Sequence, residues 1–273
     1  MRHLYGFIVL CAALIWGCQS EGDSNQSDNT SNTALMSPEE LAEEKIFNSV
    51  EKALQSDQPV YRLHLTGQNI DSLSVEIAQL KDLQELDIAS NKISRLPANI
   101  SELKNLQVLR ANDNALSGLP ETFGQLASLK ELSLAANHFV DFPEEVCQLE
   151  QLEYLNISLN GIKQLPESVG QMQNLKRLQL GFNQLSSLPD GLFTLTNIEE
   201  LALEYNRIER IPDKIQQLEA LRYLNLSENN LEPEQMNEEA VESAFGEREP
   251  RDLKERMVRA HLNELLPEAE IQF

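Results

Sequence analysis

The stretch LQELDIASNKISRLPANISELKN, residues 83–105, recurs with little change every 23 residues along the chain. A looser copy precedes it at residues 60–82, and a truncated copy starts at Leu221. A period of this length is the signature of stacked structural units, so it decides the architecture before any single element does. The other complete copies occupy residues 106–128, 129–151, 152–174, 175–197 and 198–220.

Each copy follows the pattern LxxLxLxxNxLxxLPxxIxxLxx, numbered here from its first leucine. Positions 4 and 6 alternate with polar residues, as in Leu86-Asp87-Ile88, which predicts a short strand with one buried face. Positions 14, 18 and 21 recur at helix-like spacing, and Pro97 at position 15 predicts a turn into a short helix or 3₁₀ segment. One such unit cannot bury its apolar face alone, so the units must stack with their strands in parallel.

The seven apolar positions and the recurring asparagine resemble those of leucine-rich repeat proteins, in the class whose 23-residue unit carries a Leu-Pro step. The resemblance covers residues 60–231, about eight repeats. It implies an α/β fold: a curved solenoid whose parallel sheet lines the concave face. It also implies that this face recognises a macromolecule, usually a protein.

Position 9 is polar within an apolar pattern. A buried amide needs hydrogen-bond partners, and the turn backbone of its own coil and of the next coil can supply them. We therefore interpret this position as structural rather than functional. Its asparagines are Asn91, Asn114, Asn137, Asn160, Asn183, Asn206 and Asn229.

Both ends of the array carry segments that read as caps. Residues 37–59 predict an N-terminal capping helix, which begins with Ser37 as N-cap, Pro38 at the first helical position and Glu40 completing a capping box. Residues 232–273 predict a C-terminal helical cap, with one helix over 234–245, a second ending at Pro267, and a short terminal strand at Ile271 and Phe273. Covering the open edges of a sheet prevents aggregation.

The first residues predict export and lipidation. Residues 1–17 have a basic start and an apolar run too short to span a bilayer, as in a signal peptide. Ile15-Trp16-Gly17-Cys18 resembles the lipobox of bacterial lipoproteins, although Trp16 departs from the usual small or aliphatic residue. The resemblance implies cleavage before Cys18 and acylation, including palmitate, of that residue. Residues 18–36 then read as a lipidated cysteine followed by a disordered tether.

The anchor implies a location. Gln19, in place of aspartate, points by the sorting logic of that family to the outer membrane. The acidic residues Glu21 and Asp23 resemble export tags of surface lipoproteins, which implies that the chain faces the cell exterior. The alternative, that it faces the periplasm, stays open.

Composition excludes several function classes. With 22 basic and 44 acidic residues, a formal charge of −22, the chain is a poor partner for nucleic acid or for anionic lipid surfaces. We expect membrane contact only through the lipid anchor. No carboxylate pair, metal cluster or phosphate loop has a defensible spacing, so we expect no catalytic residue, no metal, no cofactor and no small-molecule substrate. Cys147 is expected to be a small buried or half-buried thiol, and His64 an ordinary polar surface residue.

Positions 3, 5 and 7 point away from the core, and position 8 follows at the strand's edge. Leu159, Phe182 and Tyr205 occupy position 8 of three consecutive repeats and should lie side by side. Exposed aromatic residues anchor interfaces; alternatively, these rings only pack on one another and stabilise the array. The predicted partner-binding set is Tyr154, Leu159, Phe182, Tyr205, Tyr223 and Arg177.

The sequence therefore predicts a non-catalytic, lipid-anchored envelope protein, monomeric, that binds a protein partner through its concave face. An envelope scaffold or a periplasm-facing interaction module is the alternative, and an enzyme is a distant third.

Overall fold

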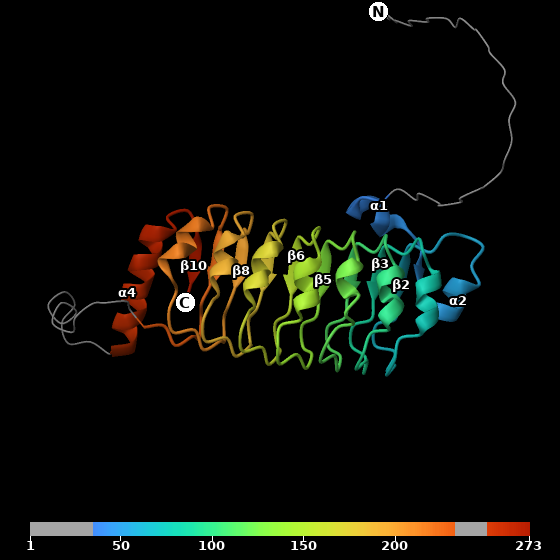
Figure 1. Cartoon of the computed structure of the whole chain (residues 1–273), viewed down its shortest axis with the longest axis horizontal. Coiled ribbons are helices and arrows are strands. Elements are labelled where there is room, and N and C mark those ends of the chain that lie inside the picture. The colour runs from blue at the N-terminus through green and yellow to red at the C-terminus, as the bar shows by residue number, and fades with distance from the viewer. Residues whose placement is uncertain (1–34, 233–249) are drawn as a thin grey trace, which may run out of the picture. The chain divides into compact units, whose positions relative to one another are not determined.

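The computed structural model describes residues 35–232 and 250–273, which belong to one compact unit spanning Leu35–Phe273. In it each repeat forms a strand, a turn and a short return segment, and the repeats stack side by side (Figure 1). The predicted signal peptide 1–17, the predicted lipidation site Cys18 and the helix expected over 234–245 lie outside the described residues.

Ten strands form one parallel sheet, in which each strand pairs with the next in chain order. Within the array equivalent positions of successive repeats face each other, as Leu63 faces Leu86 and Leu86 faces Leu109. The predicted curved solenoid of leucine-rich repeats is confirmed. The strands are β1 (Ile46–Phe47), β2 (Arg62–His64), β3 (Glu85–Asp87), β4 (Val108–Arg110), β5 (Glu131–Ser133), β6 (Tyr154–Asn156), β7 (Arg177–Gln179), β8 (Glu200–Ala202), β9 (Tyr223–Asn225) and β10 (Glu270–Gln272).

The return segments are 3₁₀ helices, one of the two conformations that their spacing predicts. Most begin directly after a proline that occupies the N-cap, such as Pro97 with φ −66°. Proline fixes φ near this value and thereby sets the direction in which the chain enters the 3₁₀ turn. These helices are η1 (Val75–Gln79), η2 (Ala98–Glu102), η3 (Phe123–Gln125), η4 (Glu144–Gln148), η5 (Glu167–Gln171), η6 (Asp190–Thr194) and η7 (Asp213–Gln217).

The core runs between the sheet and these 3₁₀ helices. Leu86 and Ile88, at positions 4 and 6 of their repeat, are fully buried, as are Phe123 and Phe139. Cys147 is buried as predicted, and burial raises the pKa of its thiol. The buried residues form one continuous cluster from Phe47 to Ile271, so each repeat completes its core with its neighbours.

The asparagine ladder has the predicted structural role. The Asn137 side-chain NH₂ donates to the carbonyls of Ala111, Leu134 and Ala135, at 3.0, 3.0 and 3.2 Å. Its side-chain oxygen accepts from the Leu116 N–H at 2.9 Å. Each such asparagine thus satisfies backbone groups in its own repeat, as predicted, and in the preceding repeat rather than the next one that the sequence suggested.

The N-terminal cap differs from the single helix predicted over 37–59. The predicted capping box at Ser37 is present, but the helix it begins, α1 (Pro38–Glu43), ends early. Strand β1 and a second short helix, α2 (Val50–Leu54), follow. The prediction was wrong because the apolar residues there do not form one stripe: Phe47 is buried while its neighbour Ile46 is 46% exposed, the alternation of a strand. Strand β1 extends the sheet beyond β2.

The C-terminal end is closed by α4 (Pro250–Leu265) and β10. Val258 and Leu262 of α4 are buried in the same core as the array, and β10 pairs with β9, the last strand of the repeats. The expected terminal strand is therefore present. No helix within residues 35–232 and 250–273 is both long and apolar enough to cross a membrane.

Candidate functional site

The outward face of the sheet carries its side chains in straight rows. Because the strands pair in register, position 3 of each repeat lies beside position 3 of the next: Arg62 faces Glu85, and Tyr154 faces Arg177. Position 5 forms a second row, in which His64 faces Asp87 and Asp87 faces Arg110. This concave face is the surface on which the sequence predicts binding.

Position 8 has an unusual backbone in every repeat. Its residues have φ between +52° and +68°, the left-handed region that favours glycine. Only the first repeat has glycine there; the others are Ser90, Asp113, Ala136, Leu159, Phe182, Tyr205 and Glu228. A large side chain in this conformation costs about 1–2 kcal/mol, so the turn itself gives no reason for leucine, phenylalanine and tyrosine in three consecutive repeats.

Two of these three side chains form a ring stack. The centroids of Phe182 and Tyr205 lie 4.2 Å apart with an interplanar angle of 12°. Phe182 remains 43% exposed, Tyr205 49% and Leu159, in the preceding repeat, 53%. We call Leu159, Phe182 and Tyr205 together the exposed aromatic column of this face, after its two stacked rings.

The other predicted binding residues lie in a different row. The Arg177 guanidinium carbon lies over the Tyr154 ring, 4.8 Å from its centroid, and the Tyr154 hydroxyl donates to Gln179 at 3.1 Å. The Tyr223 hydroxyl donates to Gln272 of β10. Both tyrosines are half-buried at position 3, where each strand begins, whereas the column lies beyond the strands' ends. The predicted set therefore occupies two rows of the face: Tyr154, Arg177 and Tyr223 at position 3, and the column at position 8.

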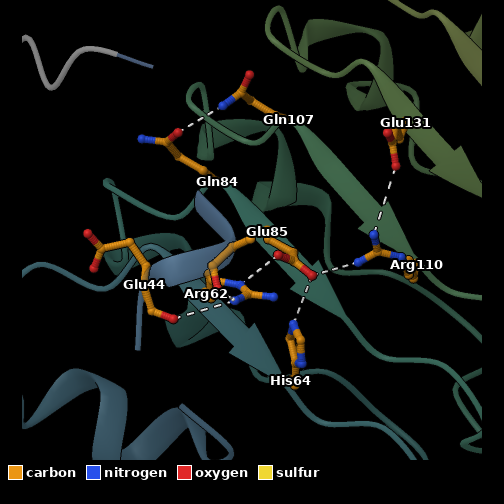
Figure 2. Close-up of polar contacts among 9 residues, drawn as sticks. Glu44, Arg62, His64, Gln84, Glu85, Gln107, Arg110 and Glu131 are labelled. Atoms are coloured by element: carbon orange, nitrogen blue, oxygen red, sulfur yellow. Dashed lines mark hydrogen bonds and ion pairs between the residues drawn. The ribbon is translucent and has the colours of Figure 1, made fainter. Parts of the chain in front are cut away.

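A charged cluster that the sequence analysis missed occupies the N-terminal end of the concave face (Figure 2). The Glu85 carboxylate accepts from Arg62 Nε at 2.7 Å, His64 Nε2 at 2.9 Å and Arg110 Nη1 at 2.6 Å. Its side chain is only 8% exposed. Burial opposes ionisation of Glu85, but the hydrogen bonds from Arg62, Arg110 and His64 together outweigh it and lower the pKa of the carboxyl. His64 is therefore not the plain surface residue expected.

This Glu85 cluster also joins the N-terminal cap to the array. Arg62 Nη1 donates to the carbonyl of Ala42, near the end of α1, at 2.8 Å. The Met36 N–H donates to Gln84 at 2.9 Å, and Gln107 donates to the Met36 carbonyl at 2.9 Å. Met36 was predicted to belong to the disordered tether, but its backbone is bound to two repeats. The partners of Glu85 are thus supplied from within the chain.

A small pocket of about 200 Å³ lies between α1 and this cluster. Leu41 and Ala42 line one side, and Val108, Arg110 and Glu131 are among the residues of the other. Arg110 Nη2 lies 3.9 Å from Glu131, so the pocket holds charges of both signs (Figure 2). Among the described residues no group of three or more His, Cys, Asp or Glu side chains could hold a metal ion.

One signal in the sequence could have revealed the Glu85 cluster. The position 3 row begins with arginine and glutamate, and the position 5 row contains a histidine and an arginine two repeats later. In-register parallel pairing places the first pair side by side. That His64 and Arg110 converge on the same carboxylate depends on side-chain conformations, which the repeat pattern does not specify.

The sequence profile of a family described as "leucine-rich repeat region" matches residues 61–138 and 132–255. The matched residues cover more than half of the chain, so it belongs to the leucine-rich repeat family. No curated protein matches the sequence at a significant level.

Three solved structures show the similarity. A leucine-rich repeat protein of Leptospira interrogans is 27% identical, with 79% of this chain and 60% of that one covered and a TM-score of 0.45. The plant peptide hormone receptor RGFR1 in complex with RGF2 is 27% identical over 63% of this chain and 33% of the receptor, with a TM-score of 0.52. The ectodomain of the Arabidopsis thaliana receptor kinase GASSHO1/SCHENGEN3, in complex with CASPARIAN STRIP INTEGRITY FACTOR 2, is 25% identical over 65% of this chain and 28% of that one, with a TM-score of 0.52. The chain thus spans less than two thirds of the length of each.

Proposed function

We propose that the chain is a non-catalytic binding protein that holds a protein partner on its concave face, chiefly at the exposed aromatic column. One observation carries the proposal: Phe182 and Tyr205 keep large, exposed rings at backbone positions that favour glycine. Burying such rings against a partner would recover apolar area that the isolated chain leaves in water. Ring stacking contributes about 0.5–1.5 kcal/mol, which offsets part of the backbone cost.

The two ends of the concave face differ in a way that supports this placement. The Glu85 carboxylate already has three donors, and Arg62 is bonded to α1 as well. The charges of Glu85 and Arg62 at that end therefore have partners within the chain. The rings of the column, in contrast, are exposed to solvent, as expected of a surface that gains contacts on binding.

Relatives of known structure support a protein partner in general terms. The two plant receptors were solved with RGF2 and with CASPARIAN STRIP INTEGRITY FACTOR 2 bound. Leucine-rich repeats commonly mediate protein–protein binding, which is the function proposed for this chain.

The column is tested by substituting its residues in the full chain, purified in mild detergent. Phe182→Asn and Tyr205→Asn remove the rings and insert a residue that tolerates positive φ. Capture of partners from an envelope extract should fall several-fold, while the melting temperature stays the same or rises. Val75→Asn, at an exposed apolar residue on a 3₁₀ helix, is the matched control. A clear loss of melting temperature with unchanged capture would instead identify the rings as packing elements.

We further propose that the chain is lipid-anchored through Cys18 at the outer membrane. The support is the lipobox-like Ile15-Trp16-Gly17-Cys18, and Gln19 after it. Labelling of cells with a palmitate analogue should mark the wild-type chain and not a Cys18→Ala variant; equal labelling of both would refute the anchor.

The direction in which the anchored chain faces separates recognition of outside partners from the alternative of an envelope scaffold facing the periplasm. Protease added to intact cells should degrade a surface-displayed chain. Protection that disappears when the outer membrane is permeabilised would favour the periplasmic scaffold.

A further inference from the structure

The aromatic column has an acidic neighbour that the sequence analysis did not single out. Glu204 directly precedes Tyr205, and Gly181 directly precedes Phe182, on two adjacent repeats. The two chain segments are joined here by the Phe182 N–H, which donates to the Glu204 carbonyl at 2.8 Å. The ring stack and the carboxylate therefore share one small area of the concave face.

Gly181 makes room for that carboxylate. A Cβ added at Gly181 would overlap the carboxylate group of Glu204, so the Glu204 side chain lies down against the backbone of the preceding repeat. Gly181 itself is buried. The absence of a side chain at this one position is what allows the carboxylate to lie there.

The carboxylate lacks a full set of donors. Its Oε2 atom is buried and has no hydrogen-bond partner. A buried acceptor of this kind, left without a donor, is destabilising, and more so when it is charged. Glu204 differs in this from Glu85, whose two oxygens accept from three basic side chains on the same face.

Three other rings in the described part of the chain have a basic side chain over them. Lys45 lies over Phe47, Arg177 over Tyr154 and Arg259 over Phe273, at 4.3, 4.8 and 4.3 Å from the ring centroids. Within residues 35–232 and 250–273, no basic side chain lies over Phe182 or Tyr205, and none forms an ion pair with Glu204. The carboxylate and the two ring faces are groups that bind a cation, but the described part of the chain supplies none to them.

The local potential favours a cation as well. The pKa of Tyr223, in the next repeat, is raised by burial first and then by the carboxylates of Glu204, Glu270 and Glu200. These three carboxylates thus lie near Tyr223, within a chain of net charge −22. An acidic surface of this kind attracts basic partners and repels a second copy of the same chain.

We propose that Glu204, Phe182 and Tyr205 form the contact site for a lysine or arginine side chain of the protein partner. The Glu204 side chain turns away from Gly181 so that its carboxylate accepts from the cationic group, and the stem or guanidinium plane of that group lies on the ring surface left open by the stack. The partner segment that binds the C-terminal half of the concave face is therefore basic. The inference deepens the proposed function and rests on it.

The test uses the full chain and a random peptide library displayed on phage. Peptides enriched on the wild-type chain should carry lysine or arginine, and their affinity should fall at least about tenfold for Glu204→Gln, which removes one charge and keeps the side-chain shape. Glu219→Gln removes the same charge from an exposed position on the return side of its repeat and should leave affinity within about twofold. Melting temperatures of both variants verify folding.

Other outcomes separate this inference from the proposed function. Enriched peptides without lysine or arginine that still lose affinity on Phe182→Asn would overturn the basic partner and leave the concave binding surface standing. Peptides insensitive to Phe182→Asn, or no enrichment at all, would overturn both. Sedimentation of the wild-type chain as a dimer that Phe182→Asn dissociates would show that a second copy, not a basic partner, covers the rings.

Discussion

At the scale of single residues, two glutamates on the same face have opposite surroundings. Glu85 is held by Arg62, His64 and Arg110, and its charge is balanced within the chain. Glu204 has a buried oxygen without a donor beside two exposed rings. The first arrangement stabilises the fold, whereas the second leaves an interaction to be made by another molecule. Residue type alone does not distinguish them, because the difference lies in the neighbours that each repeat supplies.

The Glu85 cluster has a pH signature. The pKa of the Glu85 carboxyl in the folded chain is lowered below the usual 4.5. The stabilisation that the ionised carboxylate contributes is therefore fully present above about pH 4.5 and is lost as the pH falls through the lowered pKa. At pH 7 Glu85→Gln should reduce the free energy of unfolding by about 2–3 kcal/mol, because charged hydrogen bonds are lost in a buried site. The deficit relative to wild type should shrink below pH 4.5. Urea unfolding at pH 7 and pH 3 measures both.

Glu102→Gln is the matched control for that experiment. Glu102 pairs with Lys81 at 2.7 Å, but the two side chains are 54% and 56% exposed. An exposed pair contributes at most about 1 kcal/mol. If both variants lose the same small amount at pH 7, the Glu85 cluster is not a stabilising element.

At the scale of elements, each repeat is held to the next by the sheet on one side and by the asparagine ladder at the turn. The strands are only three residues long, so few ladder hydrogen bonds join each pair. The asparagine adds two more between the repeats at each step, together with two within its own repeat. The left-handed residue at position 8 comes directly before it, so the ladder and the binding column belong to the same turn. The turn that stabilises the array is therefore also the turn that presents its exposed rings.

Replacing one ladder asparagine should be costly. Asn137→Ala leaves the buried Leu116 N–H and the Ala111 and Leu134 carbonyls without that partner, and should cost about 2–4 kcal/mol of unfolding free energy. Asn174→Ala is the control, since that exposed side chain donates one hydrogen bond, to the Glu150 carbonyl, at 2.8 Å. Chemical denaturation measures both. Equal losses would show that the ladder is not specially stabilising.

At the scale of the whole array, the described unit depends on closure at both ends. Strand β1 covers one edge of the sheet and β10 the other. The core is continuous through all repeats into α4. In a stack of this kind each repeat contacts only its neighbours, so damage at one end should stay near that end.

Weakening the C-terminal cap tests this locality. Leu262→Ala, at a residue 1% exposed, should cost about 2–5 kcal/mol at its site. Hydrogen exchange should accelerate at the amides of β9 and β10 and remain unchanged at β3 and β4. Leu132→Ala, at a fully buried position in β5, serves as the mid-array comparison and should affect repeats on both of its sides. Uniform acceleration in the Leu262 variant would mean that the array unfolds as a single cooperative unit.

The amino-acid sequence by itself determined the repeat, the strand, the existence of a short return segment, the asparagine ladder and the family. Each follows from the 23-residue repeat, because a residue's role depends on its position within one repeat and the same positions recur in several copies. It also located Leu159, Phe182 and Tyr205 in one column, because register is a property of the repeat.

Only the tertiary structure decided what departs from the repeat. The N-terminal cap folds as two short helices around a strand, since it has no repeated pattern and its apolar residues suit more than one period. The charge network of Glu85 and the unpaired carboxylate of Glu204 arise where side chains from three repeats, or a glycine and its neighbour, meet in space. These contacts depend on side-chain conformations and on where a small residue leaves room for a neighbour. The repeat pattern of the sequence specifies neither.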